Sequence, residues 1–369
     1  MIRRLREYYR QFEELSPDEI SRDLRERRDA ERASALAEVP ALDLTTPAWH
    51  EPPDAEAVNA ATYALRRSVN AYPDDGPLRD ALAARHGVVP DQVAPGHGAG
   101  ELLHAAFRAI GTGGQVAVAW PAWGPLPRLV HEAGGVPVPV PLAPAGAADA
   151  DALGAAVGRE TTAVALCTPN DPTGATVPPA DLLVLAQRLD ERVWLVVDAA
   201  LAEFAPGDER SSVARLLAAR ERVLVVRSFS KAHAMAGFRA GCALANDEEL
   251  IERLSPAGGV SAPAQAAMLW AVRDGGALVA RRRAAAARER ERLAAALAGT
   301  PFSFPAGHGH LIWLTSSAQE GADVARHLAG SRIYVTPGTA WGDDLHVRVA
   351  LRDGAATDRL AAALRELSA

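Results

Sequence analysis

The chain has 369 residues, of which 49% are hydrophobic and 23% are charged, and its formal net charge is −7. A chain of this length and composition can bury the cores of one large and one smaller domain, which excludes a disordered or fibrous protein. The acidic balance argues against a nucleic-acid-binding protein, because binding to phosphates normally needs a clustered excess of Lys and Arg.

Two features of the sequence bear on where the protein works. The N-terminal residues are charged and contain no apolar run of the kind that a signal peptide or a membrane span needs, so we expect a cytoplasmic protein without a membrane partner. Cys167 and Cys242 lie in apolar, strand-like segments and have no partner at metal-ligand spacing. We therefore predict buried, reduced thiols and no catalytic metal.

Residues 1–45 are predicted to form an N-terminal helical arm that packs with the smaller domain. Residues 16–19 read Ser-Pro-Asp-Glu, a capping pattern that marks the start of a helix. After the arm, short β-branched runs alternate with Ala/Leu-rich stretches of helical character. These runs are residues 115–119, 136–140, 162–166, 193–197 and 223–226. The alternation predicts an α/β fold with a mostly parallel central sheet, in a large domain over residues 46–262.

A different pattern begins near residue 263. A long Ala/Arg/Glu-rich stretch over residues 264–297 predicts one helix, and strand-like segments follow at 311–314 and 346–351 before a closing helix at 356–367. This order predicts a smaller α+β domain over residues 263–369.

Lys231 is the only lysine in the sequence, and it lies between a predicted strand and a glycine-containing turn. Lysine is the side chain that forms imines with an aldehyde cofactor, provided that its ammonium group is made easier to deprotonate. A lysine on the surface is the alternative reading of this residue. Its position after a buried strand favours covalent attachment of a cofactor.

Two further segments predict a ligand site at the ends of strands. Asp198 ends the run 193–197, at the carboxyl end of a strand, where ligands of open α/β sheets bind. Gly98, Ala99 and Gly100 open a predicted helix, and their backbone N–H groups can hold a phosphate. Considered alone, Asp198 could be a turn residue, and a single glycine loop is weak evidence.

The segment around Lys231 resembles the Schiff-base signature of fold-type I, class I/II aminotransferases that depend on pyridoxal 5′-phosphate (PLP). It reads Ser228-Phe-Ser230-Lys231, with Arg239 eight positions after the lysine. The order of motifs from Tyr72 to Arg348 is most similar to that of histidinol-phosphate aminotransferases. The resemblance implies the PLP-transferase fold type I and a Schiff base between PLP and Lys231.

The same resemblance implies roles for the other motif residues. Asp198 would pair with the pyridine nitrogen of PLP, Trp123 would stack on its ring, and Arg348 would clamp the substrate α-carboxylate. Tyr72 would reach the cofactor phosphate of a neighbouring subunit, which implies a homodimer with shared active sites. The phosphate ligands would be Gly98, Ala99, Gly100, Ser228, Ser230 and Arg239.

Two positions depart from the family pattern. Asp171 stands where the family has an asparagine, and Leu201 stands where it has a tyrosine. Both family residues donate hydrogen bonds to the phenolate oxygen of the cofactor, and an ionised carboxylate would repel that oxygen. Either Asp171 is protonated, or Asn170 binds the cofactor instead, or the chemistry has changed.

The resemblance implies transamination between an amino donor and a keto acceptor, with Lys231 as the proton-transferring base. The donor would be an amino-alcohol phosphate such as histidinol phosphate, or an aromatic or other amino acid. A PLP-dependent decarboxylase or lyase on the same fold is an alternative, and a non-catalytic protein that keeps the fold is another.

Overall fold

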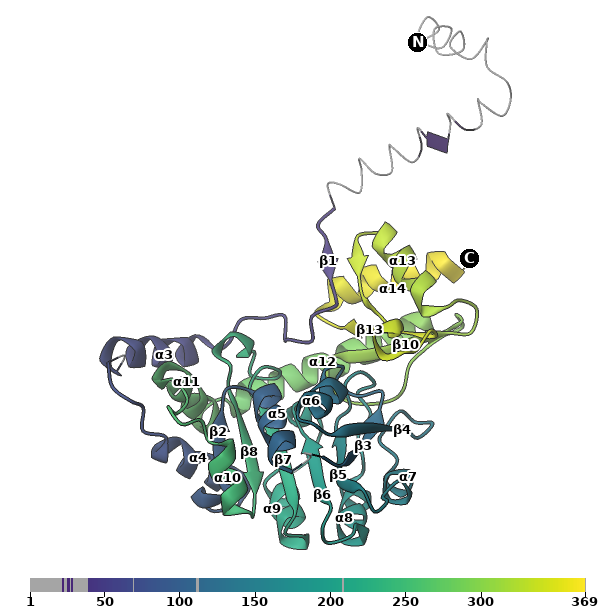
Figure 1. Cartoon of the computed structure of the whole chain (residues 1–369). Helices are drawn as coiled ribbons and strands as arrows, with labels where there is room; N and C mark the ends of the chain where they lie inside the picture. The colour runs from purple at the N-terminus through teal and green to yellow at the C-terminus, as the bar shows by residue number, and fades with distance from the viewer. Residues whose placement is uncertain are drawn as a thin grey trace, which may run out of the picture.

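The structure is a computed structural model, and it describes residues 22, 25, 26, 28, 39–68, 70–110, 113–207 and 209–368. The capping pattern predicted at residues 16–19 lies outside the described residues. Within the predicted arm, Arg22, Arg25, Glu26 and Arg28 are helical. The chain forms a large part around one wide sheet and a smaller part around a second sheet, and α12 runs between the two (Figure 1).

The large part is built on a seven-stranded sheet. Its strands, in spatial order, are β2 (Val93–Gly96), β8 (Gly241–Ala245), β7 (Val223–Ser228), β6 (Trp194–Asp198), β5 (Thr161–Cys167), β3 (Gln115–Trp120) and β4 (Val136–Pro141). Only β8 runs antiparallel to its neighbours, while the pairs from β7 to β4 are all parallel. The prediction of a mostly parallel central sheet is confirmed.

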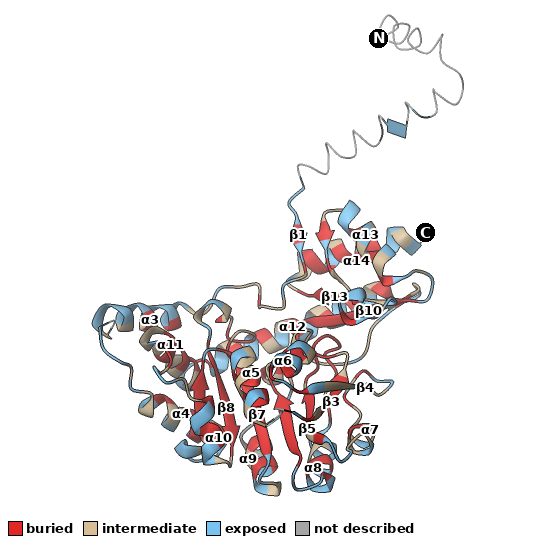
Figure 2. Ribbon diagram, viewed as in Figure 1, coloured by how far each residue is buried: buried red, intermediate tan, exposed pale blue. Residues whose placement is uncertain are grey.

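Helices cover both faces of this sheet, because alternate residues of each strand point to opposite sides. In β3, Val116 and Val118 belong to one core, whereas Ala117 and Ala119 belong to the other. Figure 2 shows the central strands buried between helices whose outer faces are exposed. One face carries α3 (Ala55–Ser68), α4 (Gly76–His86), α7 (Ala150–Ala155), α8 (Pro179–Arg188), α9 (Glu209–Ala219) and α11 (Ala262–Arg273), and the other carries α5 (Ala99–Ile110), α6 (Leu126–Glu132) and α10 (Glu248–Leu254).

The smaller part surrounds an antiparallel four-stranded sheet and has its own core. Here β1, which belongs to the predicted N-terminal arm, pairs in parallel with β11. The strands of the four-stranded sheet are β12 (Thr336–Pro337), β13 (His346–Ala350), β10 (Leu311–Ser316) and β9 (Phe302–Ser303); the pair is β1 (Leu42–Asp43) with β11 (Ile333–Tyr334); the helices are α12 (Gly276–Leu297), α13 (Gly321–Gly330) and α14 (Gly354–Ser368).

The predicted single helix over residues 264–297 is wrong, because the chain breaks between α11 and α12. The amides of Asp274 and Gly275 make the last helical hydrogen bonds of α11, to the carbonyls of Trp270 and Ala271 at 2.8 and 3.1 Å. A side chain at Gly275 would place its Cβ 2.6 Å from the Ala271 carbonyl oxygen, so the turn needs glycine. Helix α11 packs on α3 and shares its core; the domain boundaries at residues 45 and 262 stay a prediction.

The short 3₁₀ helices lie in the connections. They are η1 (Pro90–Gln92), η2 (Ala202–Phe204), η3 (Ala236–Phe238) and η4 (Gly338–Trp341). Between β1 and α3, residues 44–54 cross from the smaller part to the larger one, and we call this segment the strap (Figure 1). In the part of the chain that the structure describes, no helix is long and apolar enough to cross a membrane.

Candidate active site

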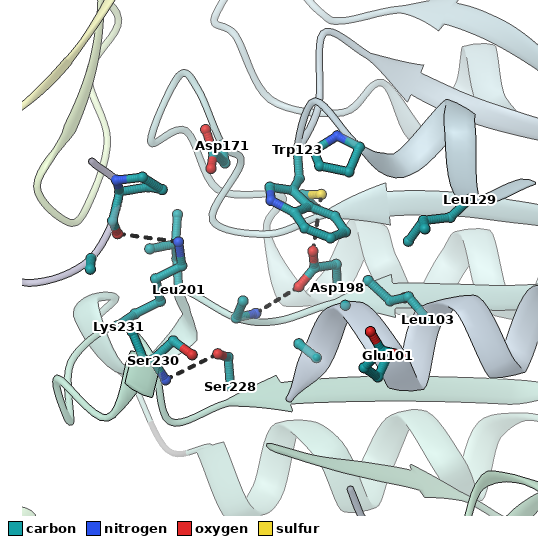
Figure 3. A pocket seen from close by; sticks show the side chains of 18 of the residues that line it. Glu101, Leu103, Trp123, Leu129, Asp171, Asp198, Leu201, Ser228, Ser230 and Lys231 are labelled. Carbon is teal, nitrogen blue, oxygen red and sulfur yellow. Dashed lines mark hydrogen bonds between the residues drawn. The ribbon is translucent and has the colours of Figure 1, made fainter. Parts of the chain in front are cut away.

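The polar residues predicted for the site meet at one edge of the seven-stranded sheet. Because β3, β5, β6 and β7 are parallel, their carboxyl ends lie together. Trp123 follows β3, Asp171 follows β5, Asp198 ends β6 and Lys231 follows β7. All four line a cavity of about 390 Å³, which is a typical size for a cofactor pocket (Figure 3).

Lys231 reaches into this cavity from the loop after β7. Its Nζ donates a hydrogen bond to the backbone carbonyl of Pro47 in the strap, at 3.2 Å. Desolvation by the surrounding protein lowers the pKa of Lys231, while the negative charges of Asp171 and Asp198 act in the opposite direction. A lysine whose pKa is lowered is more often a neutral amine, which is the nucleophilic form.

Asp198 is buried at the floor of the cavity. Its Oδ1 accepts a hydrogen bond from the Ala200 amide at 2.9 Å, and its Oδ2 lies 3.7 Å from Cys167 Sγ. Burial raises the pKa of Asp198, although the Ala200 amide and the charge of Lys231 oppose this shift. A cationic partner stabilises the ionised form of such a buried carboxyl group, and the protonated ring nitrogen of PLP would supply that partner.

The start of α5 forms the end of the cavity that suits a phosphate. The first amides of a helix have no partner within the helix, and the helix dipole favours an anion there. Gly98 has φ +96°, and a Cβ at this position would lie 2.7 Å from Nη2 of Arg239. The guanidinium therefore packs directly on the glycine turn. Ser228 and Ser230 complete this end, where the Ser230 amide donates to Ser228 Oγ at 3.1 Å.

Trp123 forms one wall of the cavity. Figure 3 shows its indole ring next to Asp198, with the Lys231 side chain on the left of the view. A Cβ at Gly100 would lie 3.0 Å from Cη2 of this ring, so glycine is needed for the close approach of α5. A flat cofactor ring at the cavity floor would face the indole.

Arg348 in β13 approaches the cavity from the smaller part of the molecule. Its Nη1 donates to Asp171 Oδ1 at 3.2 Å, and its Nη2 donates to the backbone carbonyl of Thr45 at 2.8 Å. The guanidinium also lies over the ring of Trp341, 5.1 Å from the ring centroid. The strap, β5 and β13 thus meet at one arginine.

Three of the predicted cofactor residues, Gly98, Asn170 and Tyr72, do not line the cavity, and neither does the predicted substrate-binding Arg348. Asn170 is fully buried, and its Nδ2 donates to the Pro121 carbonyl at 3.0 Å and to Thr173 Oγ1 at 3.1 Å, so its side chain points into the loop. Tyr72 is 92% exposed. Leu201, where the family has tyrosine, does line the cavity and is nearly fully buried.

The strap contributes to the site in a way that the sequence did not predict. Thr46, Pro47 and Ala48 line the cavity, and carbonyl groups of the strap bind Lys231 and Arg348. A backbone carbonyl in an irregular segment leaves no pattern in a sequence, because any residue can supply it. Cys167 also lines the cavity; Cys167 and Cys242 are both buried thiols, which confirms the prediction of buried thiols.

A family model described as aminotransferase class I and II matches residues 43–364. The chain belongs to this family. Its members use PLP, and the cavity fits that cofactor: it has a phosphate cradle at α5, a buried carboxyl group for the ring nitrogen and a lysine of lowered pKa. The predictions of a PLP-dependent aminotransferase and of fold type I are confirmed.

Individual relatives agree with this assignment. An aromatic amino acid aminotransferase from Corynebacterium jeikeium (strain K411) is 34% identical over 314 residues, covering 79% of this chain and 83% of the relative. One from Mycobacterium sp. (strain KMS) is 32% identical over 304 residues, covering 78% and 82%. The enzyme is therefore a transaminase that acts on an amino acid.

Solved structures show the same fold. An aspartate aminotransferase from Thermus thermophilus with maleate has a TM-score of 0.79 at 26% identity, covering 92% of this chain and 95% of that one. A histidinol-phosphate aminotransferase from Sinorhizobium meliloti in complex with PLP has the same TM-score, identity and coverage. The structural likeness thus extends over several substrate classes.

Proposed function

We propose that this transaminase takes its amino group from an aromatic amino acid and passes it to a keto acid. The curated relatives described above are named aromatic amino acid aminotransferases. The walls of the cavity agree with an apolar substrate side chain, because Leu103, Trp123, Leu129 and Leu201 all line it.

The positions of the charged residues around the cavity support an aromatic substrate. Among the described lining residues, the arginines are Arg128 and Arg239. Arg128 forms a 2.9 Å ion pair with Glu132 at an exposed position, and Arg239 packs on the glycine turn at the phosphate end. Neither arginine is placed to bind a second carboxylate on the substrate, which disfavours a dicarboxylic amino acid.

The proposed roles of the site residues follow from their positions. PLP, when bound, supplies an electron sink and the carbonyl group to which Lys231 links. Lys231, as the freed amine, moves a proton to and from the substrate α-carbon. Asp198 holds a proton at the ring nitrogen, and Arg348 binds the α-carboxylate. Ser228, Ser230, Arg239 and the amides of residues 98–100 hold the phosphate.

We also propose a homodimer in which Tyr72 completes the neighbouring active site. Tyr72 is 92% exposed and follows α3, a helix that also exposes Tyr63 and Leu65, and such exposed apolar side chains are typical of a surface that another chain covers. Sedimentation of the holoenzyme at twice the chain mass is the expected result, and a monomer would contradict it. A cytoplasmic location is likewise proposed, supported by the two buried thiols and testable by cell fractionation.

A substrate panel tests the proposed specificity. The holoenzyme is mixed with phenylalanine, tyrosine, aspartate or histidinol phosphate, and the change in cofactor absorbance is followed in single turnovers. An apolar pocket discriminates by about tenfold or more, so phenylalanine or tyrosine should exceed the other two by at least that factor in kcat/KM. A preference for aspartate or histidinol phosphate would overturn the proposal.

A further inference from the structure

Asp171 and Arg348 form a buried ion pair beside the cavity, which Asp171 lines and Arg348 does not. Asp171 is 4% exposed and Arg348 is 8% exposed, and their Oδ1 and Nη1 atoms are 3.2 Å apart. An arginine that binds a substrate carboxylate normally presents a free fork of N–H donors. In this protein, Nη1 of Arg348 is already paired with a carboxylate of the protein itself, that of Asp171.

The remaining contacts of Arg348 hold its guanidinium group in the position where it pairs with Asp171. Its Nη2 is bound to the Thr45 carbonyl, and one face of the guanidinium lies on Trp341. A substrate carboxylate must therefore compete with Asp171 or share the guanidinium with it. Sharing would bring two anionic groups close together in a buried site, where repulsion between like charges is weakly screened.

The second oxygen of Asp171 is also informative. Within the described residues, Oδ2 of Asp171 is buried and has no hydrogen-bond partner, although Asp171 lines the cavity. A buried carboxylate oxygen that lacks a donor adds unsatisfied negative charge to the region where the substrate binds. An incoming carboxylate meets this charge and an arginine whose Nη1 is paired with Asp171, while the buried Nε of Arg348 has no hydrogen-bond partner among the described residues.

We infer that Asp171 is a specificity-determining residue that lowers the affinity of the pocket for a substrate α-carboxylate by occupying Arg348. The enzyme consequently gains less binding energy from the α-carboxylate and depends more on the substrate side chain for selection. The inference rests on the proposed aromatic specificity only for the choice of probe.

The test measures binding of an unreactive carboxylate, so it does not need turnover. The probe is 3-phenylpropionate, which has no amino group, and its affinity for the PLP-loaded enzyme is measured by calorimetry. Asp171→Asn keeps the size of the side chain and removes its charge. We expect this variant to bind the probe about tenfold more tightly than wild type; equal or weaker binding would overturn the inference.

A matched control separates this effect from a general change in charge. Asp358 in α14 forms an exposed ion pair with Arg292 in α12 at 2.8 Å, and neither residue lines the cavity. Asp358→Asn removes the same charge and should leave the affinity for 3-phenylpropionate unchanged. A tenfold gain in this variant too would show that net charge, and not Asp171, sets the affinity.

A second measurement needs no variant. Wild-type holoenzyme is titrated with 3-phenylpropionate and with its uncharged amide, 3-phenylpropanamide. Because Arg348 is already paired, the carboxylate should bind less than about tenfold more tightly than the amide. A larger preference for the carboxylate would overturn the inference. If neither phenyl probe binds, the ratio of carboxylate to amide affinity is measured with 4-methylpentanoate and its amide instead. Failure of the phenyl probes alone would contradict only the aromatic specificity.

Discussion

The two sheets that border the active site contribute to it in different ways. The seven-stranded sheet supplies Asp198 and Lys231 at the ends of strands, where the backbone leaves the sheet and side chains point into the cavity. The four-stranded sheet supplies Arg348 from the middle of β13, through the alternation of its side chains. In the proposed function, the first sheet carries the groups that react, and the second positions a group that binds the substrate.

This difference indicates which substitutions change the chemistry and which change recognition. In the proposed function, residues at the strand ends would touch the reacting atoms directly. Residues of the smaller part act through contacts across the boundary, such as those of Arg348 with Asp171 and of Trp341 with the loop after β3. Three variants test this division, and their effects are expected to differ in size.

Removing the amine at the strand end should have the largest effect. Lys231→Ala removes both the point of cofactor attachment and the proposed base, so kcat should fall by at least about a thousandfold. Because Lys231 is the only lysine, borohydride reduction of the wild-type holoenzyme should label one lysine-containing peptide. Labelling of any other site, or retained turnover in Lys231→Ala, would contradict the assigned role.

Glu203 in η2 tests the buried ion pairs next to the strand ends. Its buried carboxylate lies 3.2 Å from His233 Nε2 and 3.4 Å from Arg227 Nη2, and these partners hold the pKa of Glu203 at about 2 despite its burial. Glu203→Gln leaves buried positive charge less compensated, so the free energy of unfolding should fall by about 3 kcal/mol in urea denaturation.

The pH dependence of that variant provides an independent check. Since the pKa of Glu203 is lowered in the folded protein, its stabilising effect is present above the usual value of 4.5 and is lost as the pH falls through about 2. The difference between wild type and Glu203→Gln should therefore shrink between pH 4.5 and 2. As a control, loss of the exposed pair in Asp358→Asn should cost less than about 1 kcal/mol.

Trp341 in η4 tests the contact between the two parts, and its effect should be the smallest. Its Nε1 donates to the Ala122 carbonyl at 2.7 Å, and its own carbonyl accepts from Trp120 Nε1 at 3.0 Å. Trp341→Phe removes the first bond and keeps an aromatic face for Arg348, which costs about 1 kcal/mol. We expect KM for the amino donor to rise about fivefold with kcat nearly unchanged.

One outcome for Trp341→Phe would contradict this expectation. A fall in kcat without a change in KM would show that the smaller part acts on the chemistry and would remove the division between the two sheets. Trp270→Phe in α11 is the matched control, because it makes the same substitution outside the cavity. Its kinetic constants should equal those of wild type.

The sequence by itself determined most of the large sheet and the reactive half of the site. The β-branched runs predicted β3 to β7 with small shifts at their ends, and parallel strands must bring their carboxyl ends to one edge. Asp198 and Lys231 could therefore be placed together before any coordinates. These properties are local: they depend on a strand, the turn after it and a side chain whose chemistry is evident from its type.

Only the tertiary structure decided the contacts between segments that are distant along the chain. The pair of Asp171 with Arg348 joins residues 177 positions apart, and the strap brings the carbonyls of Thr45 and Pro47 to Arg348 and Lys231. The break at Gly275 and the inward turn of Asn170 depend on their neighbours in the same way. Such contacts arise from how separate elements pack, and the local pattern of residues does not contain that information.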